Sequence, residues 1–484
     1  MPYLIAVDIG TTSAKALAVD AVGNVLASDQ RFYPTQFGSA GEAEQNPQQI
    51  FEAVVDLIRS INVSLPSVSA EALVFSAAMH SVMAVDAAGD PLTPLLIWAD
   101  TRSVEQAQSL TSQASFLAQL TGTPVHPMSP LCKMMWWKQH DPVLFKSASK
   151  FISIKEFVIR KLTGLYLIDH SIASATGCFD LQYRAWSTQA LAILGMEPSR
   201  LSEPASVYKQ VSLTQPALDM LLLPKAMPLV LGASDGCCAQ LGSDAMREGD
   251  VAITVGTSGA VRMASRHRIV PVRGQLFNFI LDDEDFVFGG ATNNGTALVN
   301  WFQSINVNAP ADLSEFVTEA ATVAPGSEGL VMLPYVLGER APVYDATACG
   351  AFIGISVAHG RLHFQRALLE GICFALKDIF EQIRQSGKVA NRIVVSGGIT
   401  RSTEWMQMLC NVLQQELQWL NQPDASAIGA AKIGFRALGW QWRAAAPEMH
   451  VFEPQRSLAQ VYDRQFALYQ RLYPALNELR TKFE

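Results

Sequence analysis

The chain has 484 residues, of which 49% are hydrophobic and 17% charged, and its formal net charge at pH 7 is -8. A chain of this length exceeds what one hydrophobic core supports, so we expect a globular enzyme of two domains. The negative charge disfavours nucleic acid and anionic membranes as main partners, although it allows small anions in a locally positive pocket.

The seven cysteines form no CxxC pair, and many of their neighbours are apolar. This spacing disfavours a zinc site and predicts reduced, buried thiols in a cytoplasmic protein. The start of the chain lacks a basic n-region and a cleavage site, and no apolar run is long enough for a bilayer. We therefore expect neither a signal peptide nor a transmembrane helix.

The chain begins with an apolar hairpin whose turn suits phosphate. Two strands are predicted at residues 4–8 and 16–20, and the turn between them is Gly10-Thr11-Thr12. Glycine lets the backbone approach a ligand closely, and the threonines supply donors to phosphate oxygens. The sequence therefore predicts a phosphate-binding turn here.

Two charged residues flank this turn. Asp8 ends the first strand and is a candidate Mg²⁺ ligand, acting through water because Mg²⁺ keeps most of its aqua ligands. Lys15 lies in the second strand, where it can neutralise phosphate charge. Taken alone, the same residues also fit an ordinary hairpin.

The rest of the first half alternates strands and helices. The period of its apolar residues predicts the following elements: a third hairpin strand at 25–29, a helix from residue 47, strands at 72–77, 82–86 and 95–98, a largely helical region at 103–200, and a strand at 228–233.

Polar side chains follow two of these strands. His80 comes soon after one strand end, and Trp98, Asp100 and Arg102 mark the other. Strand ends at one edge of an α/β sheet form ligand crevices. Together these side chains offer a ring for a sugar face, hydroxyl partners and, in Arg102, a fork that matches a carboxylate. Further candidates are Lys133 and, more weakly, Lys155, His126 and Asp169.

Asp235 follows the last strand of the first half and precedes a helix that starts with small residues. Phosphoryl transfer to a hydroxyl needs a base that orients the nucleophile and accepts its proton. A carboxylate at a strand-to-helix corner fits that role. The alternative is a helix N-cap, which is a common use of aspartate.

The second half repeats the hairpin of the first. Strands are predicted at 251–255 and 260–263, with Gly256 and Thr257 in the turn. Two such turns predict a duplicated architecture that holds one polyphosphate from both sides. Because only the first copy carries an aspartate, we expect that half to handle metal and chemistry. The expected domains are residues 1–245 and 246–484.

The remaining elements complete a second α/β unit. They are predicted as follows: helices at 291–302, 313–322, 360–387, 403–418, 425–438 and 458–481, a strand with a loop at 329–340, and a strand at 392–396. After the last of these strands, Gly397 and Gly398 let the chain pass a flat nucleoside. A simple Gly-Gly turn is the alternative.

The chain resembles the FGGY carbohydrate kinases of the actin-like ATPase superfamily over almost its full length. The resemblance rests on Gly350-Ala351-Phe352-Ile353-Gly354-Ile355, on Gly338-Glu339-Arg340-Ala341-Pro342 and on Glu44-Gln45-Asn46-Pro47. Within the family, Ser76–Val82, Ile97–Arg102, Gly122–Met128 and Ile154–Glu156 are most similar to gluconate kinases, with xylulokinases as the nearest rivals.

The resemblance implies two actin-like, ribonuclease H-like domains, each a mixed β-sheet flanked by helices, with the active site in the cleft between them. It implies that Asp235 is the general base and that Asp8 and Asp235 lie at the metal. It places the two turns at the phosphates and Gly397, Gly398 and Arg401 near the adenosine. Besides Asp235, the residues predicted for the substrate from the strand ends and the charges are His80, Trp98, Asp100, Arg102 and Lys133. The family often has Gly where this chain has Ser234.

The expected reaction is MgATP-dependent phosphorylation of a terminal hydroxyl of an open-chain sugar acid, D-gluconate to 6-phosphogluconate. The alternative with the same chemistry is a xylulokinase or another ketose or polyol kinase. An actin-like ATPase that acts as a chaperone or filament, and a non-catalytic sugar sensor, are alternatives of other classes. The sequence says little about oligomeric state and leaves a homodimer open.

Overall fold

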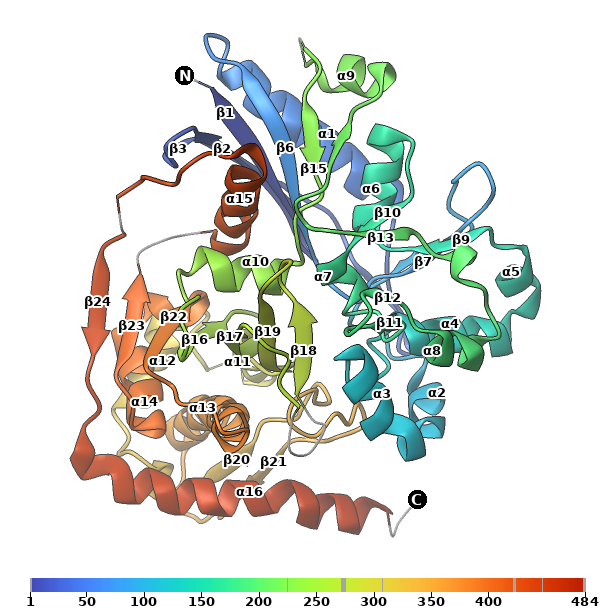
Figure 1. The fold of residues 1–484 in the computed structure, drawn as a ribbon. Helices are drawn as coiled ribbons and strands as arrows, with labels where there is room; N and C mark the ends of the chain where they lie inside the picture. The colour runs from blue at the N-terminus through green and yellow to red at the C-terminus, as the bar shows by residue number, and fades with distance from the viewer. Residues whose placement is uncertain are drawn as a thin grey trace.

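The structure is a computed structural model, and it describes residues 2–223, 225–270, 276–306, 308–420, 424–445 and 447–481. Two large sheets organise the chain (Figure 1). The first has the order β14-β15-β6-β1-β2-β3 and the second the order β18-β19-β17-β16-β22-β23-β24. Helices cover both, as predicted for a mixed α/β protein.

The strands of the first sheet are β1 (Tyr3–Ile9), β2 (Ser13–Asp20), β3 (Val25–Phe32), β6 (Ala70–Ala77), β14 (Gln210–Ser212) and β15 (Pro228–Val230). Those of the second are β16 (Asp250–Val255), β17 (Gly259–Ser265), β18 (Phe277–Ile280), β19 (Phe286–Thr292), β22 (Arg392–Ser396), β23 (Leu417–Leu420) and β24 (Met449–Phe452). Smaller sheets contain β4 (Gln36–Phe37), β5 (Ala43–Gln45), β7 (Met83–Val85), β8 (Leu95–Leu96), β9 (Lys150–Ile152), β10 (Leu167–Asp169), β11 (Phe179–Asp180), β12 (Ala185–Trp186), β13 (Glu203–Ala205), β20 (Val331–Leu333) and β21 (Ala351–Ile353).

The helices of the first half are α1 (Pro47–Ser64), α2 (Val104–Ser109), α3 (Ala114–Thr121), α4 (Pro130–His140), α5 (Pro142–Ser147), α6 (Ile154–Thr163), α7 (His170–Ala173), α8 (Thr188–Leu194), α9 (Gln215–Leu221) and α10 (Asp235–Gly242). Those of the second are α11 (Thr296–Ile305), α12 (Leu313–Ala321), α13 (Arg361–Gln385), α14 (Thr403–Leu413), α15 (Ala425–Leu438) and α16 (Ala459–Thr481). None of the helices in the described parts of the chain has the length and apolar character that a bilayer crossing needs.

The two sheets share one topology. β1 pairs antiparallel with β2 and parallel with β6, and β6 continues in parallel to β15. β16 pairs antiparallel with β17 and parallel with β22, and β22 continues in parallel to β23. The repeated hairpin seen in the sequence is therefore the start of a repeated sheet, and both turns lie at the corresponding edge.

Two predicted helices are wrong in part. The segment predicted as a helix from residue 291 is still strand until Thr292, because β19 pairs along β17 and the helix begins only at Thr296. The helix predicted to reach residue 418 ends at Leu413. Gln414 adopts a left-handed φ of 53°, which turns the chain into β23. The expected strand at 95–98 is only two residues long, and the region 103–200 contains short strands between its helices.

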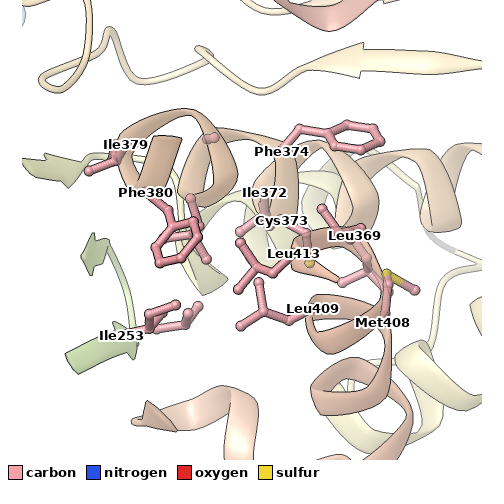
Figure 2. Packing of buried hydrophobic residues seen from close by; sticks show 14 of the residues in the cluster. Ile253, Leu369, Ile372, Cys373, Phe374, Ile379, Phe380, Met408, Leu409 and Leu413 are labelled. Carbon is pink, nitrogen blue, oxygen red and sulfur yellow. The ribbon is translucent and has the colours of Figure 1, made fainter. Parts of the chain in front are cut away.

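The second sheet is covered by a long buried helix. α13 packs on α14 and on the sheet, and Figure 2 shows Leu369 and Cys373 of α13 close to Leu409 and Leu413 of α14, with Ile253 of β16 nearby. All five side chains are fully buried. This core fixes the strands whose ends carry the second turn.

A separate core joins the two halves. α15 follows all strands of the second sheet except β24 in the chain, yet it packs against α10 and against β1 and β6 of the first sheet (Figure 1). The backbones of α10 and α15 touch: a Cβ built on Gly429 would overlap the carbonyl oxygen of Cys238, and one on Gly242 would overlap that of Ala425. Glycine at both positions lets the helices cross this closely.

We predict that Gly429→Ala lowers the free energy of unfolding by about 3 kcal/mol, because the added methyl group meets backbone that cannot rotate away. The matched control is Gly434→Ala on the same helix. There the nearest atoms are the side chains of Leu4 and Val74, at 3.0 and 3.2 Å, which can shift. Chemical denaturation of both variants is the measurement. Equal losses would contradict the close crossing of α10 and α15.

Candidate active site

A cleft of about 880 Å³ opens between the two sheets. Both halves line it, with Thr11, His80 and Asp235 from the first and Thr257, Arg262 and Arg340 from the second. The predicted location of the site between the halves agrees with this geometry.

Two carboxylates lie close enough to interact at the site, and of these only Asp235 lines the cleft itself. Asp8 lies near the end of β1, and its Oδ1 is buried without a hydrogen-bond partner among the described residues. Burial raises the pKa of Asp8. Asp235 is the first residue of α10, and burial together with the Asp8 charge raises its pKa to about 7. A carboxylate with this pKa exchanges a proton near neutral pH.

The N-cap role that was the alternative for Asp235 belongs to its neighbour. The Ser234 hydroxyl accepts from the amide of Cys237 at 3.4 Å and so caps α10. The Asp235 carboxylate accepts from the amide of Gly236 at 2.6 Å and reaches the cleft. Because Ser234 caps α10, the Asp235 carboxylate is not needed as the N-cap of this helix.

The two predicted phosphate turns meet at the cleft. Each is closed by a backbone bond, Gly10 donating to Ser13 at 3.0 Å and Gly256 donating to Ser258 at 2.9 Å. Thr11, Thr12, Gly256 and Thr257 line the cleft. α11 begins directly on the second turn, since the Thr296 amide donates to Gly256 at 2.7 Å. Helix amides at this end favour an anion.

The residues predicted near an adenosine adjoin the second turn but do not line this cleft. Gly397 follows β22, and a Cβ built on it would lie 2.5 Å from the Val255 carbonyl oxygen. Gly398 and Arg401 continue the same connection towards α14, and Arg401 is exposed. The connection therefore lies beside the phosphate turn, where a nucleoside would leave the phosphates.

Lys15 pairs with Asp424, which immediately precedes α15. Both side chains are about a quarter exposed, at 28% and 24%. The Asp424 charge also raises the pKa of Asp8. Lys15, which was predicted to neutralise phosphate charge, thus already forms an ion pair with a carboxylate of the second half at the edge of the site.

Of the five residues predicted for the substrate, His80 and Trp98 line the cleft, whereas Asp100, Arg102 and Lys133 do not. The Arg102 guanidinium binds Asp100 at 2.7 Å and Glu44 at 2.6 Å. The structure therefore does not bring Arg102 to a substrate carboxylate, because two carboxylates of the chain already occupy it.

Lys133 supports the strand ends instead. Its buried ammonium donates to the carbonyl oxygens of His80 at 2.8 Å and Ile97 at 2.5 Å, and burial lowers its pKa to about 7. Lys155 has a similar place near Asp235. It pairs with Asp169 at 2.8 Å and donates to the Ala233 carbonyl oxygen at 3.0 Å.

Two histidines present opposite hydrogen-bonding capacities to the cleft. His80 Nδ1 lies 2.8 Å from the Ala175 carbonyl oxygen, which can only accept, so Nδ1 carries the proton and Nε2 accepts. His126 Nδ1 accepts from the Met128 amide at 3.1 Å, which leaves Nε2–H as a donor without a partner among the described residues. Burial lowers both pKa values to about 3, so both rings are neutral.

Sequence reasoning missed two arginines of the cleft. Arg340 belongs to a motif that was noted without a role, and its guanidinium lies over the Trp98 ring at 4.7 Å, across the two halves. Arg262 lies in β17 on the same face as Ala260, which also lines the cleft. The period-2 alternation after the second turn was the available signal for it.

Comparisons with known proteins agree with this arrangement. The models of the FGGY family of carbohydrate kinases, N-terminal and C-terminal domains, match residues 3–242 and 251–438. The chain belongs to the FGGY family of carbohydrate kinases. It is 36% identical to a gluconokinase of Bacillus subtilis over 90% of this chain and 88% of the relative, and 29% identical to a xylulose kinase of the same organism over 99% and 98%.

Solved structures give the same fold. The kinase matches a gluconate kinase from Lactobacillus acidophilus with a TM-score of 0.93 and a xylulose kinase from that organism with a TM-score of 0.94. Both are 30% identical and fully covered, as is this chain. The predicted two-domain actin-like fold is confirmed. The kinase is a sugar kinase of a family that uses ATP as phosphate donor.

We predict that the raised pKa of Asp235 makes the kinase lose stability as pH rises. The folded protein keeps the Asp235 proton up to about pH 7, whereas the unfolded chain releases it near 3.8, the ordinary pKa of aspartate. Stability is therefore present at low pH and lost as pH rises through 7. Asp235→Asn removes this loss, worth about 3 kcal/mol between pH 5 and pH 8. Denaturant unfolding at both pH values is the measurement; parallel pH profiles would contradict the pKa.

Proposed function

We propose that the kinase phosphorylates the terminal hydroxyl of D-gluconate to give 6-phosphogluconate, with ATP as donor and Mg²⁺ as the metal. The observation that carries this proposal is Asp235, a carboxylate with a pKa near 7 that lines the same cleft as the residues of both turns. The similarity to gluconokinases at 36% and 35% identity supports the choice of acceptor.

In the proposed reaction, Asp235 orients the acceptor hydroxyl and accepts its proton. The hydroxyl oxygen forms the new bond to the γ-phosphorus as the bond to the ADP oxygen breaks. Amides and hydroxyls of the two turns hold the phosphates from opposite halves. General-base catalysis of this kind contributes roughly 10²–10⁴-fold, and positioning and charge neutralisation supply the rest.

The residues present fit a magnesium ion. Among the described residues no cluster of three or more histidine, cysteine or acidic side chains could enclose a metal. Mg²⁺ needs no such cage, because it keeps several waters and binds through one or two carboxylates and the substrate phosphates. The unpartnered Oδ1 of Asp8, with Asp235 nearby, supplies this donor set. When bound, the metal neutralises charge that develops on the phosphates.

The acceptor lies, in this proposal, against Trp98, whose Nε1 donates to the Thr11 hydroxyl at 3.1 Å. The Nε2 atoms of His80 and His126 then offer one acceptor and one donor to sugar hydroxyls. Arg340 covers the indole from the other half and helps to exclude water. A site that excludes water favours transfer to the sugar over hydrolysis of ATP.

A xylulokinase is the second candidate, favoured by the similarity to the Lactobacillus xylulose kinase structure. The two candidates share the base and the phosphate sites and differ only in the acceptor. A cytoplasmic location and a homodimer stay predictions from the sequence.

An ADP-release assay with MgATP and single acceptors tests the proposal. We expect D-gluconate to give the highest kcat/KM, and D-xylulose, L-ribulose, glycerol and no acceptor to give much lower values. The kcat/KM for gluconate should rise with pH through about 7, because Asp235 must be ionised to accept a proton. Preference for a ketopentose would replace gluconate by the second candidate.

Asp235→Asn should lower kcat by about 10³-fold while the protein still binds ADP, because the amide cannot accept the proton. Asp283→Asn is the matched control, since Asp283 is 45% exposed and does not line the cleft. Activity of the first variant within a few-fold of the parent would remove Asp235 from the base role.

Asp8→Asn should raise the Mg²⁺ concentration for half-maximal activity about tenfold or more and lower kcat by about 100-fold. The same change should move the acidic limb of the pH profile to lower pH, because the Asp8 charge raises the pKa of Asp235. Titrations of Mg²⁺ and pH measure both effects. An unchanged Mg²⁺ dependence would exclude Asp8 as the metal site.

A further inference from the structure

A buried guanidinium borders the cleft without an anion. Arg262 is 8% exposed, and its Nη2 donates to the Thr254 hydroxyl at 2.6 Å. Its Nε has no hydrogen-bond partner, and no ion pair joins it to a carboxylate of the described residues. Burial lowers the pKa of Arg262, and the Asp235 charge offsets this in part without a direct ion pair, so a bound anion would complete this position.

The other arginine of the cleft is already engaged. Arg340 Nε donates to Asn293 at 2.7 Å, its Nη2 donates to the Thr292 carbonyl oxygen at 3.0 Å, and its planar face lies over Trp98. Arg102 is occupied by two carboxylates outside the cleft. Arg262 is therefore the cleft arginine with the most donor capacity left.

Gly236 separates Arg262 from the base. A Cβ built on Gly236 would lie 3.8 Å from Arg262 Nη1 and 3.0 Å from Met79 Cε. The missing side chain lets Met79 and the Arg262 guanidinium pack close to the start of α10. An acceptor that reacts at Asp235 therefore has this guanidinium nearby in the same cleft.

The surroundings of Arg262 suit a carboxylate more than a phosphate. β17 leads away from the second phosphate turn, so Arg262 lies three residues beyond Gly259, roughly 10 Å along the strand. Phe277, Phe279 and Val287 line the same part of the cleft. Apolar walls keep water away, which strengthens a guanidinium–carboxylate contact.

We propose that Arg262 binds the carboxylate of the acceptor and thereby selects a sugar acid over a neutral sugar. The inference rests on the proposed function. In an open-chain acid the carboxylate lies at the opposite end from the terminal hydroxyl. The hydroxyl then sits at Asp235, the carbon chain lies in the cleft, and the carboxylate meets the guanidinium of Arg262. The cation also offsets repulsion between Asp235 and the substrate carboxylate.

Equilibrium binding of D-gluconate and its neutral analogue D-gluconamide tests the proposal. We expect Arg262→Gln to raise the Kd for gluconate by about 100-fold or more and that for gluconamide by only a few-fold. Arg262→Lys keeps the charge but loses the fork, so its Kd for gluconate should lie between those of the parent and the glutamine variant.

Two controls separate loss of recognition from loss of structure. ADP binding should be unchanged in both Arg262 variants, which shows that the nucleotide site is folded. Arg266→Gln is the matched surface variant, because Arg266 follows β17, is 67% exposed and pairs with Glu284 and Asp285 outside the cleft. It should leave both dissociation constants as they are.

Equal losses on gluconate and gluconamide would overturn the proposal, as would an unchanged gluconate Kd with a large fall in kcat. The second result would place Arg262 at the transferred phosphoryl group. Failure of the proposed function gives a different result, in which the unmodified kinase does not turn over gluconate at all.

Discussion

The proximity of two carboxylates, Asp8 and Asp235, is the constraint on which the rest of the site depends. Asp8 has an oxygen without a partner, and its charge adds to burial in raising the pKa of Asp235. Placing two negative groups together costs free energy that must be offset elsewhere in the fold. The offset comes from cations that border the site, with Lys15, Arg262 and Arg340 around the carboxylates.

The charged side chains of the first half show how positioning roles are distributed around the site. Lys133 and Lys155, which sequence reasoning considered for the substrate, instead bind backbone carbonyl groups, and Arg102 binds the carboxylates of Glu44 and Asp100. Lys133 ties together the carbonyl groups behind His80 and Trp98, and Lys155 holds the carbonyl two residues before Asp235. Positioning and chemistry are thus divided between different side chains of the same motifs, and the exposed surface of the site is less charged than its sequence implies.

Much of the fold could be predicted from the sequence because its signals are local. The hairpin turns, the helix of residues 361–385 and the strand-to-helix corner at Asp235 each follow from a short pattern. The end of α14 could not be predicted, because Gln414 adopts a left-handed conformation without a glycine or asparagine to indicate it. The place of Arg102 could not be predicted either, since its partner Glu44 is distant in sequence. The alternation along β17 places Arg262 on the same face as Ala260, but the strand is buried on both faces and its other residues are small or apolar, so this signal was easily missed.

The position of α15 bears on how the molecule unfolds. The chain reaches this helix only after completing most of the second sheet, yet the helix buries side chains of β1 and β6. Neither half can therefore be cut from the other at the sequence boundary without exposing an apolar face. When the first sheet unfolds, it must therefore release α15, a helix that lies among the elements of the second sheet in the order of the chain. The two halves are bound into one cooperative unit, and any movement that opens the cleft has to bend around this shared helix pair rather than separate it.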